Sequence, residues 1–434
     1  MDCTDILLIG GGGREHALAR ALCRSPRVAR VHVAPGNGGT DGDLDGRIHN
    51  VPLPADDLDG LLAFARTRGI GLTVVGPEAP LVAGIVDRWA AAGLRCFGPS
   101  RAAAQLEGSK AFAKAFMQRH GIPTARSGTF TTVEPALAWI DAASFPVVVK
   151  ASGLAAGKGV ILPETRDEAG AAVRAMIDGG AFGGAGAEVV VEERLVGEEV
   201  SLMALCDGTT AVSLPPARDH KRALDGDLGL NTGGMGAFAP TPALTGAALE
   251  AVERDVMQKT VDGMAAEGVP YRGVLYAGLM LTVDGPRVLE FNCRFGDPET
   301  QVVLPLLDAD LLDAFDACID GTLIDTRLTV SKDAAATVVL ASGGYPREYV
   351  KGLTIDGIPA ADALEGATVY HAGTRRVAEG WQTSGGRVLA VTGRGADLKD
   401  ALRRAYAGID RIAFEGAHHR TDIGRVGLVA RSGS

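Results

Sequence analysis

Residues 145–163 read FPVVVKASGLAAGKGVILP, two apolar runs joined by a loop of small residues. Lys150 ends the first run, and Lys158 lies near the end of the loop. A P-loop would need more residues between its glycines, a hydroxyl residue where Gly159 stands, and a helix rather than an apolar strand after the lysine. We therefore expect a glycine-rich flap between two strands, suited to cover a triphosphate with its backbone amides and Lys158.

The alternative is a plain surface hairpin with an exposed lysine. Lys150 argues against it, because a lysine at the end of an apolar strand is costly unless an anion or a carboxylate pairs with it.

An acidic turn follows the flap at residues 189–201, VVVEERLVGEEVS. The apolar strand runs into Glu192, Glu193 and Leu195, whose backbone can form a hinge that pairs with the edge of an adenine. Glu199 can then accept hydrogen bonds from ribose hydroxyls. A solvated acidic turn between two domains explains the same residues equally well.

Residues 286–301, PRVLEFNCRFGDPETQ, carry a polar ladder on an apolar strand. Glu290 and Asn292 are two apart, so they share one face of the strand and offer hard oxygen ligands. Magnesium takes few protein ligands and keeps positions for water and phosphate. Arg294 continues on that face, where it can hold a carboxylate or a developing phosphoryl charge. With the flap upstream, this pattern favours a nucleotide–magnesium site over an ordinary exposed strand face.

The N-terminal hundred residues alternate apolar strands with helices, which predicts a parallel sheet covered on both faces. The first strand enters the turn LIGGGGREHAL at residues 8–18. A dinucleotide fingerprint fails here, because Glu15 occupies the third glycine position and no carboxylate ends the second strand. Glycines at a helix N-terminus still suit a single phosphate. The loops at 34–40 and 75–80 belong to the same edge of the sheet. Three loops at one edge favour a ligand pocket there over a tight turn that binds nothing.

Later segments divide the rest of the chain. A helical connector covers 101–124, a small α/β unit follows to 195, and strands dominate from 196 to about 325. We predict an α/β protein with four domains: 1–105 (doubly wound parallel sheet), 106–195 (connector and flap), 196–328 (metal site) and 329–434 (a small α+β domain). The Asp284-Gly285 pair predicts a hairpin between two strands of the third domain.

The composition is that of a globular chain, with 46% hydrophobic and 22% charged residues and a net charge of -10. The acidic balance argues against nucleic acid and membrane surfaces as partners. Six scattered cysteines without a C-x-x-C pair indicate reduced thiols. Without a signal peptide pattern or an apolar run of about 18 residues, the chain is expected to be cytoplasmic.

Two further loops carry candidate site residues. The cluster 219–222 reads DHKR, and the turn 231–236 reads NTGGMG, with almost no side chains. Such a turn allows the backbone to come close to a ligand. Each loop is also compatible with a plain surface turn.

The order of these motifs resembles that of the phosphoribosylamine–glycine ligases, a family of ATP-grasp enzymes, over nearly the whole chain. The motifs are LIGGGGREHAL, APGNGGT, VGPEAPL, QLEGSKAF, KASGLAAGKGV, EERLVGEE, DHKR, NTGGMGA, LEFNCRFGDPETQ and GGYP. The resemblance implies an ATP-grasp core between an N-terminal and a C-terminal domain. It also implies ligation of glycine to 5-phosphoribosylamine through glycyl phosphate, with ADP and phosphate as products, in de novo purine synthesis.

The resemblance also assigns residues. Contacts to ATP are implied for Lys110, Lys150, Gly157, Lys158, Glu192, Glu193, Leu195 and Glu199, and Mg²⁺ or Mn²⁺ ligation for Glu290 and Asn292. Arg294, Lys158 and Asp219 are implied as the catalytic residues. The substrates are implied to contact Gly12, Gly13, Arg14, Glu15, Asn37, Glu78, Asp219, Lys221, Asn231, Gly233, Arg294 and Asp297. The chain departs from the family pattern at Leu230, where a proline is expected, and at Thr421, where a lysine is expected.

Three other functions compete with this one. Another ATP-grasp carboxylate–amine ligase or carboxylase of the same route is closest, but NCRFGDPET and GGREHAL favour the glycine enzyme. A dinucleotide-dependent oxidoreductase is opposed by the failed fingerprint. A nucleotide-sensing module without turnover leaves Glu290 and Asn292 without a role. We expect a monomer that acts on small molecules, with transient contact to the enzyme that supplies phosphoribosylamine as a further option.

Overall fold

The N-terminal domain is built on a five-stranded parallel sheet in the order β3-β2-β1-β4-β5. The computed structural model describes residues 3–155, 159–180 and 182–430. The strands are β1 (Thr4–Gly10), β2 (Val28–Pro35), β3 (Ile48–Asn50), β4 (Leu72–Val75) and β5 (Cys96–Phe97). The helices are α1 (Gly13–Leu22), α2 (Asp43–Gly46), α3 (Leu58–Arg68), α4 (Glu78–Val82) and α5 (Ile85–Ala91).

Helices cover both faces of this sheet, as the continuous apolar strands predicted. Ile6 and Leu8 of β1 pack in one core with Leu18 of α1. Leu7 and Ile9, which point the other way, pack in another core with Trp89 of α5. The loops after β1, β2 and β4 therefore meet at one edge of the sheet.

The apolar pattern of residues 79–93, APLVAGIVDRWAAAG, predicts one helix, but the chain forms two helices there. Gly84 separates α4 from α5 and adopts a left-handed conformation, with φ of 88°. Because this backbone region favours glycine, the chain can turn there without strain. The interruption leaves Glu78 in the first turn of the short helix α4.

The connector and flap form a second, smaller layer. Ser109 has an extended backbone and divides the predicted connector into α6 (Gln105–Gly108) and α7 (Lys110–Arg119), capping α7 through its hydroxyl. An antiparallel sheet in the order β6-β9-β7-β8 follows. Its elements are β6 (Ser127–Phe130), α8 (Val133–Ala142), β7 (Val147–Ala151), β8 (Val160–Ile161), α9 (Arg166–Ile177), η1 (Gly183–Gly186) and β9 (Val189–Glu193).

A second antiparallel sheet, β11-β10-β16-β17, faces this layer across the site. Its strands are β10 (Glu198–Asp207), β11 (Ala211–Ser213), β16 (Arg272–Thr282) and β17 (Gly285–Asn292). The predicted hairpin joins β16 to β17, with Thr282 paired to Gly285. The segment expected to be mostly strands also contains α10 (Gly246–Val252), a π-helix η3 (Glu253–Gln258), α11 (Lys259–Ala266), α12 (Thr300–Val303), η4 (Leu304–Leu306), α13 (Leu311–Asp320) and η5 (Leu323–Asp325).

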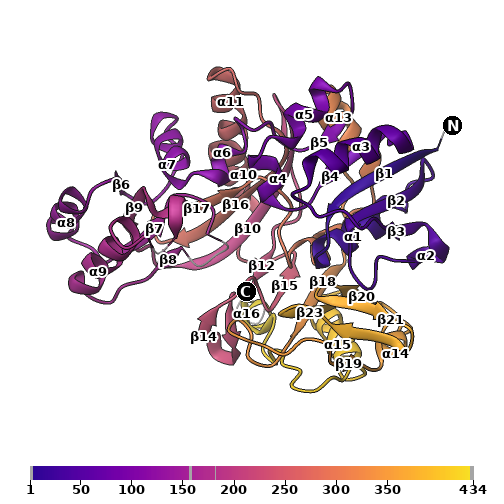
Figure 1. The fold of residues 1–434 in the computed structure, drawn as a ribbon. Coiled ribbons are helices and arrows are strands. Elements are labelled where there is room, and N and C mark those ends of the chain that lie inside the picture. The colour runs from indigo at the N-terminus through magenta and orange to yellow at the C-terminus, as the bar shows by residue number, and fades with distance from the viewer. Residues whose placement is uncertain (1–2, 156–158, 181, 431–434) are drawn as a thin grey trace.

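The C-terminal sheet has the order β12-β15-β18-β23-β20, so it combines strands from two distant parts of the chain. β12 (Arg218–Asp219) and β15 (Gly236–Ala239) precede β18 (Ala334–Ala341) by about a hundred residues, and β20 (Ala367–His371) and β23 (Arg387–Gly395) follow later still. The remaining elements are β13 (Arg222–Leu224), η2 (Asp225–Asp227), β14 (Leu228–Asn231), β19 (Thr354–Ile355), α14 (Ile358–Asp362), β21 (Thr374–Val377), β22 (Gly380–Thr383), α15 (Leu398–Ile409) and α16 (Arg425–Ala430). Figure 1 shows the C-terminal elements in orange and yellow at the bottom of the molecule, with the pink β14 beside them.

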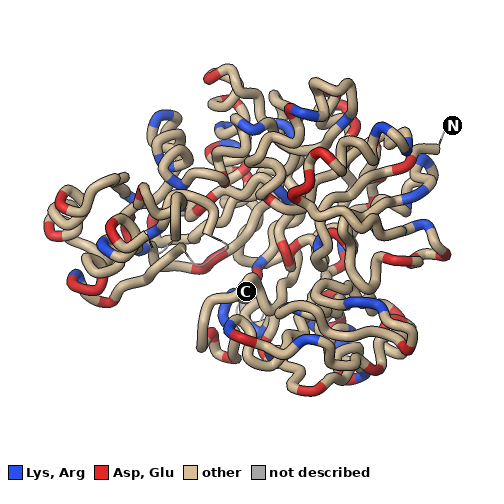
Figure 2. The backbone as a smooth tube through the Cα atoms, in the orientation of Figure 1, with Lys and Arg blue, Asp and Glu red and all other residues tan. Residues whose placement is uncertain are grey.

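Charged residues of both signs are interspersed along the whole described backbone (Figure 2). The six cysteines are free thiols, and only Cys3 is exposed. Among the described residues, no helix has the length and apolar character needed to cross a membrane.

Candidate active site

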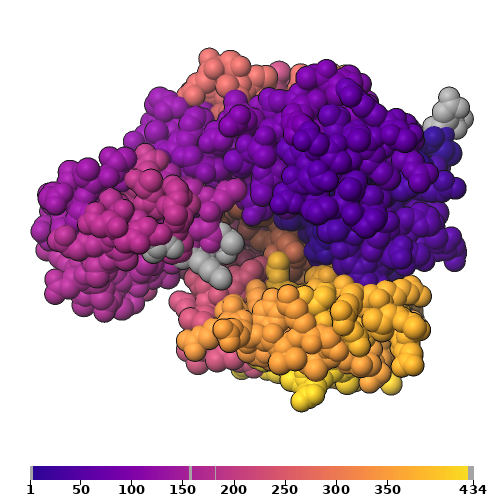
Figure 3. Space-filling model, viewed as in Figure 1, coloured from indigo at the N-terminus to yellow at the C-terminus, as the bar shows by residue number. Residues whose placement is uncertain are grey.

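A cavity of about 690 Å³ opens where the N-terminal, central and C-terminal parts of the chain meet. Figure 3 shows the hollow between the indigo, magenta and orange bodies. Twelve of the predicted site residues line it: Arg14, Glu78, Lys110, Lys150, Asp219, Lys221, Asn231, Gly233, Glu290, Asn292, Arg294 and Asp297. The fold thus brings together residues that lie up to 283 positions apart (Arg14 to Asp297) in the sequence.

The polar ladder on β17 points into this cavity. Glu290 pairs in register with Gly278, and Asn292 with Tyr276, so both lie on one face of the strand. Burial alone would raise the pKa of Glu290, but Lys221, Lys150 and Lys110 hold that pKa below its usual range. Glu290 is therefore an anionic oxygen donor beside the amide oxygen of Asn292, and this donor set suits a hard divalent cation.

Arg294 is held by two carboxylates from separate elements. Its Nη2 lies 3.0 Å from Oε1 of Glu107, and its Nε lies 3.5 Å from Oε2 of Glu78. Nη2 also donates to Oδ1 of Asn292 at 3.1 Å. Burial alone would lower the pKa of Arg294, but Glu107 and Glu78 raise it, so the guanidinium stays charged inside the cavity wall.

Glu107 was not among the predicted site residues. It lies in the short helix α6, where it is buried beside Leu106, and its carboxylate accepts a hydrogen bond from the Cys293 amide at 2.7 Å. Burial raises the pKa of Glu107, and the nearby Arg294 lowers it in part. A charged residue on a buried helix face was the signal for a site residue here.

The lysines of the central domain surround one buried carboxylate. Glu192, whose side chain is 2% exposed, pairs with Lys114 at 2.5 Å and also with Lys150. The predicted need of Lys150 for a carboxylate partner is thus met by Glu192. Burial alone would raise the pKa of Glu192, but the two lysines lower it. Lys114, which the sequence reasoning missed, also lines the cavity.

The DHKR loop contributes a second pair of opposite charges. Lys221 Nζ lies 2.6 Å from Oε2 of Glu199 on β10. Asp219 lines the cavity, and burial raises its pKa to about 7, although Lys221 opposes the shift. With a pKa near neutral pH, the Asp219 carboxyl group can gain or lose its proton when a charged ligand enters the cavity.

The first glycine turn is already occupied by a side chain of the protein. The Gly12 amide donates to Oε2 of Glu15 at 2.6 Å, and Arg14 contacts Oε1 at 2.7 Å. The expectation of free amides for an anion therefore does not hold at Gly12, because the Glu15 carboxylate reaches back to the N-cap amide. Asn37 donates to the Gly11 carbonyl at 3.0 Å, so Glu15 and Asn37 hold the loop, while Arg14 faces the cavity.

The C-terminal domain completes the cavity wall. Arg387 contacts Asp297 at 3.0 Å and donates to the Gly233 carbonyl at 2.5 Å. The glycines of the NTGGMG turn allow close approach of protein atoms, and Gly233 also lines the cavity, so the expected approach of a ligand to this turn stays a prediction. A Cβ on Gly234 would lie 2.4 Å from Cδ of Pro298.

The remaining predicted residues lie elsewhere. Glu193 points outward and pairs with Arg126 at 2.9 Å. Leu195 and Glu199 are half-buried near the hinge, and neither borders the cavity. Gly13 lies next to Gln301. Gly157 and Lys158 lie outside the described residues.

Two antiparallel sheets enclose a cavity, with the buried Lys150 on one sheet and the Glu290–Asn292 ladder on the other, and lysines of the neighbouring helix α7 also line it. This arrangement defines an ATP-grasp enzyme. Models of the phosphoribosylglycinamide synthetase family match the chain in three parts: the N domain over residues 4–107, the ATP-grasp (A) domain over 108–300 and the C domain over 335–426. The chain belongs to the phosphoribosylglycinamide synthetase family.

Individual relatives agree with this. The chain is 54% identical to a phosphoribosylamine–glycine ligase of Allochromatium vinosum, over 96% of this chain and 97% of that one. It is 50% identical to that of Chlorobaculum tepidum, over 98% and 100%. The crystal structure of the Thermotoga maritima enzyme of this name superposes with a TM-score of 0.82 at 35% identity, over 96% of this chain and all of that one.

Proposed function

We propose that the chain uses ATP to join glycine to 5-phosphoribosylamine, giving glycinamide ribonucleotide, ADP and phosphate, as a step of purine biosynthesis. The observation that carries the proposal is the arrangement in one cavity of Arg14 from the N-terminal sheet edge, Lys110 and Lys150 from the central domain, and Glu290 and Asn292 on β17. Each of these groups suits a different part of the three substrates.

The chemistry requires an activated carboxylate. An amine does not attack a carboxylate at neutral pH, because oxide is a poor leaving group. We infer that an oxygen of the glycine carboxylate attacks the γ-phosphorus of ATP, forming glycyl phosphate and releasing ADP. The amine nitrogen then forms a bond to the acyl carbon, the C–O bond to phosphate breaks, and the amine loses a proton. The protein contributes positioning and charge neutralisation.

The central domain supplies the residues for ATP. Lys110 and Lys150 are proposed to contact its phosphates, with Gly157 and Lys158 of the flap covering them. The backbone of Glu192, Glu193 and Leu195 is proposed to hold the adenine, and Glu199 the ribose. These roles rest on the family motifs and, for the two cavity lysines, on their positions in the wall.

Glu290 and Asn292 are proposed to hold the divalent cation, Mg²⁺ or Mn²⁺. Their oxygens fit it, because Glu290 is ionised and the Asn292 amide oxygen, which accepts one hydrogen bond from Arg294, has a second lone pair. When bound, the cation neutralises phosphate charge. Few protein oxygens are needed beside those of ATP, and no group of three or more His, Cys, Asp or Glu ligands gathers among the described residues.

The other walls are proposed to bind the two reacting partners. Arg294 and Asp219 lie near glycine and the transferred phosphoryl group, with Lys221, Asn231, Gly233 and Asp297 beside them. The edge made by Gly12, Gly13, Arg14, Glu15, Asn37 and Glu78 receives the phosphoribosyl group. Since Glu15 already caps Gly12, we assign the phosphate to Arg14 rather than to the Gly12 amide.

The direct test is turnover by the purified protein. ADP formation is measured with ATP and MgCl₂, with glycine and phosphoribosylamine added separately and together. The proposal requires that ADP forms at full rate only when both are present. If turnover ignored glycine and consumed another carboxylic acid, the assignment of the substrate would fail while the ATP-grasp class would stand.

We further propose a cytoplasmic monomer divided into domains 1–105, 106–195, 196–328 and 329–434. The free thiols support the compartment. Because glycyl phosphate and phosphoribosylamine both hydrolyse, transient contact with the enzyme that supplies the amine would limit its loss. Mass measurement in solution tests the monomer.

A further inference from the structure

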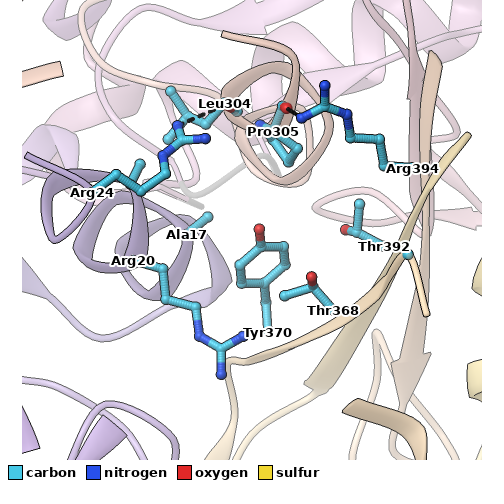
Figure 4. Close-up of a pocket in the computed structure, with 11 residues that line it drawn as sticks. Ala17, Arg20, Arg24, Leu304, Pro305, Thr368, Tyr370, Thr392 and Arg394 are labelled. Atoms are coloured by element: carbon cyan, nitrogen blue, oxygen red, sulfur yellow. Dashed lines mark hydrogen bonds between the residues drawn. The ribbon is translucent and has the colours of Figure 1, made fainter. Parts of the chain in front are cut away.

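A second cavity, of about 300 Å³, lies between α1 of the N-terminal domain and strands β20 and β23 of the C-terminal sheet. Figure 4 shows its wall, which also includes Leu304 and Pro305 of η4. It shares no lining residue with the first cavity. The proposed reaction gives it no role.

The polar groups of this wall are cationic or neutral. Arg20, Arg24 and Arg394 line it together with Thr368 and Thr392, and none of its lining residues is acidic. This is notable in a chain that holds 53 acidic and 43 basic residues. A concave wall of this kind attracts an anion.

The three arginines differ in how far they are neutralised. Arg20 lies 2.7 Å from Asp43, and Arg394 lies 2.7 Å from Asp333. Arg24 forms no ion pair within the described part of the chain, and its Nη2 donates to the Leu304 carbonyl at 3.0 Å. Arg24 is therefore the cation whose charge remains available to a ligand.

The floor of the cavity carries a hydroxyl group without a protein partner. Tyr370 is only 6% exposed, and Figure 4 shows its hydroxyl pointing into the cavity toward Leu304 and Pro305. Its oxygen makes no hydrogen bond to any residue that the structure describes, and Tyr370 lines the cavity, so the hydroxyl is open to a ligand there. Burial raises the pKa of Tyr370 to about 12, so at neutral pH the group is a hydrogen-bond donor.

We infer that this cavity binds a small phosphate monoester, whose oxyanion accepts from Arg24 and from the hydroxyls of Tyr370 and Thr368. The apolar wall from Ala17 and Pro305 then packs against the carbon part of the ligand. The volume suits a molecule of the size of a pentose phosphate. A ligand there joins the N-terminal domain to the C-terminal sheet.

The site also has a physical connection to the first cavity. The Thr392 hydroxyl in its wall donates to the Gln301 carbonyl at 3.1 Å, and the Gln301 side chain donates to Asp297 at 2.7 Å. Asp297 lines the first cavity. Helix α1 borders both, with Arg14 at one and Arg24 just beyond its end at the other.

Calorimetric titration of the full chain with ribose 5-phosphate, and separately with inorganic phosphate, tests the inference. The double variant Arg24→Ala/Tyr370→Phe removes the proposed contacts, and Arg14→Ala removes the phosphate contact of the first cavity. Wild-type protein is expected to bind two molecules of ribose 5-phosphate and each variant one. If the proposed function were wrong and the second cavity right, wild-type protein and Arg14→Ala would each bind one molecule and the double variant none.

Two single variants keep the inference testable if the double variant does not fold. Tyr370→Phe deletes only an unpartnered hydroxyl, and Arg24→Glu changes an exposed side chain, so both should fold and retain turnover. Each is expected to weaken the second site at least tenfold. Binding of inorganic phosphate there would show that the oxyanion alone suffices, and binding of the sugar phosphate alone would show that the carbon part is needed. Equal stoichiometry and affinity in wild-type protein and all three second-site variants would overturn the inference.

Discussion

Two adjacent glutamates on β9 provide a sharp test of how the site is held together. Glu192 points inward and is shared by the ammonium groups of Lys114 and Lys150, whose side chains are 4% and 8% exposed. Glu193 points outward and pairs with Arg126 at the surface. The substitutions Glu192→Ala and Glu193→Ala therefore remove the same group from the same strand, but only the first leaves buried charges without a partner.

The structure sets the expected size of the difference. Removing one member of a buried ion pair costs about 3–5 kcal/mol of unfolding free energy. Lys114 keeps the Thr124 hydroxyl at 2.7 Å and Lys150 keeps the Leu289 carbonyl at 3.3 Å, so the loss should lie near the lower end, about 3 kcal/mol. An exposed pair such as Glu193–Arg126 contributes little. With a urea dependence of about 2 kcal/mol/M, the Glu192→Ala midpoint should fall by about 1.5 M.

Urea unfolding of the three proteins, followed by circular dichroism at pH 7 and pH 9.5, measures this. Burial already lowers the pKa of Lys114, and without Glu192 this lysine loses the carboxylate that opposes the shift. The folded state of Glu192→Ala then binds fewer protons than the unfolded chain, so its stability rises with pH through that interval. The penalty should thus be smaller at pH 9.5 than at pH 7. Equal midpoints for the two variants at pH 7 would refute the reasoning that Glu192 holds the lysines.

Three further predictions concern the cavity. Glu290→Ala should lower ADP formation at saturating MgCl₂ at least 100-fold, about 2.7 kcal/mol of transition-state free energy, because an ionised ligand is lost; a steady-state assay that finds wild-type turnover would exclude the metal role. Arg294→Lys keeps the charge but not the planar fork that reaches Glu107, so kcat/KM should fall at least tenfold, and an unchanged value would contradict the role of the fork. The raised pKa of Asp219, about 7, means that folded protein holds a proton that the unfolded chain releases near pH 4, so stability from this group is lost as pH rises from about 4 to about 7. Asp219→Asn should therefore gain in thermal midpoint relative to wild type between pH 4.5 and pH 8, and parallel curves would contradict this.

Local sequence patterns were enough to predict the helices, strands and turns that depend on contacts between residues close in the sequence. The apolar strands of the N-terminal sheet, the hairpin of β16 and β17 and the shared face of Glu290 and Asn292 all follow from a period of two or from turn chemistry. The break between α4 and α5 at Gly84 was not predicted. An isolated glycine makes a helix less favourable, but it does not show whether the helix ends there.

Contacts between distant segments were the part that local patterns did not contain. Arg387 reaches Asp297, and β15 pairs with β18 across about a hundred residues. Nothing in the sequence near Arg387 marks it as a site residue, because its role depends on the position of the C-terminal sheet. The three-dimensional path of the chain therefore had to be known before the third wall of the cavity could be assigned.

The first glycine turn is different, because its sequence did contain the missing information. Gly12 is the N-cap of α1, and Glu15 stands three residues later, which is the spacing at which a carboxylate reaches back to the N-cap amide. The turn was interpreted as a free anion site because the glycines were weighed and this spacing was not. Because the capped Gly12 amide cannot also bind a phosphate, we assign the attraction for the phosphoribosyl group at this edge to a side chain. Arg14 is the cation that the same turn directs into the cavity, which is why its substitution, rather than that of the glycines, should abolish binding of the phosphate there.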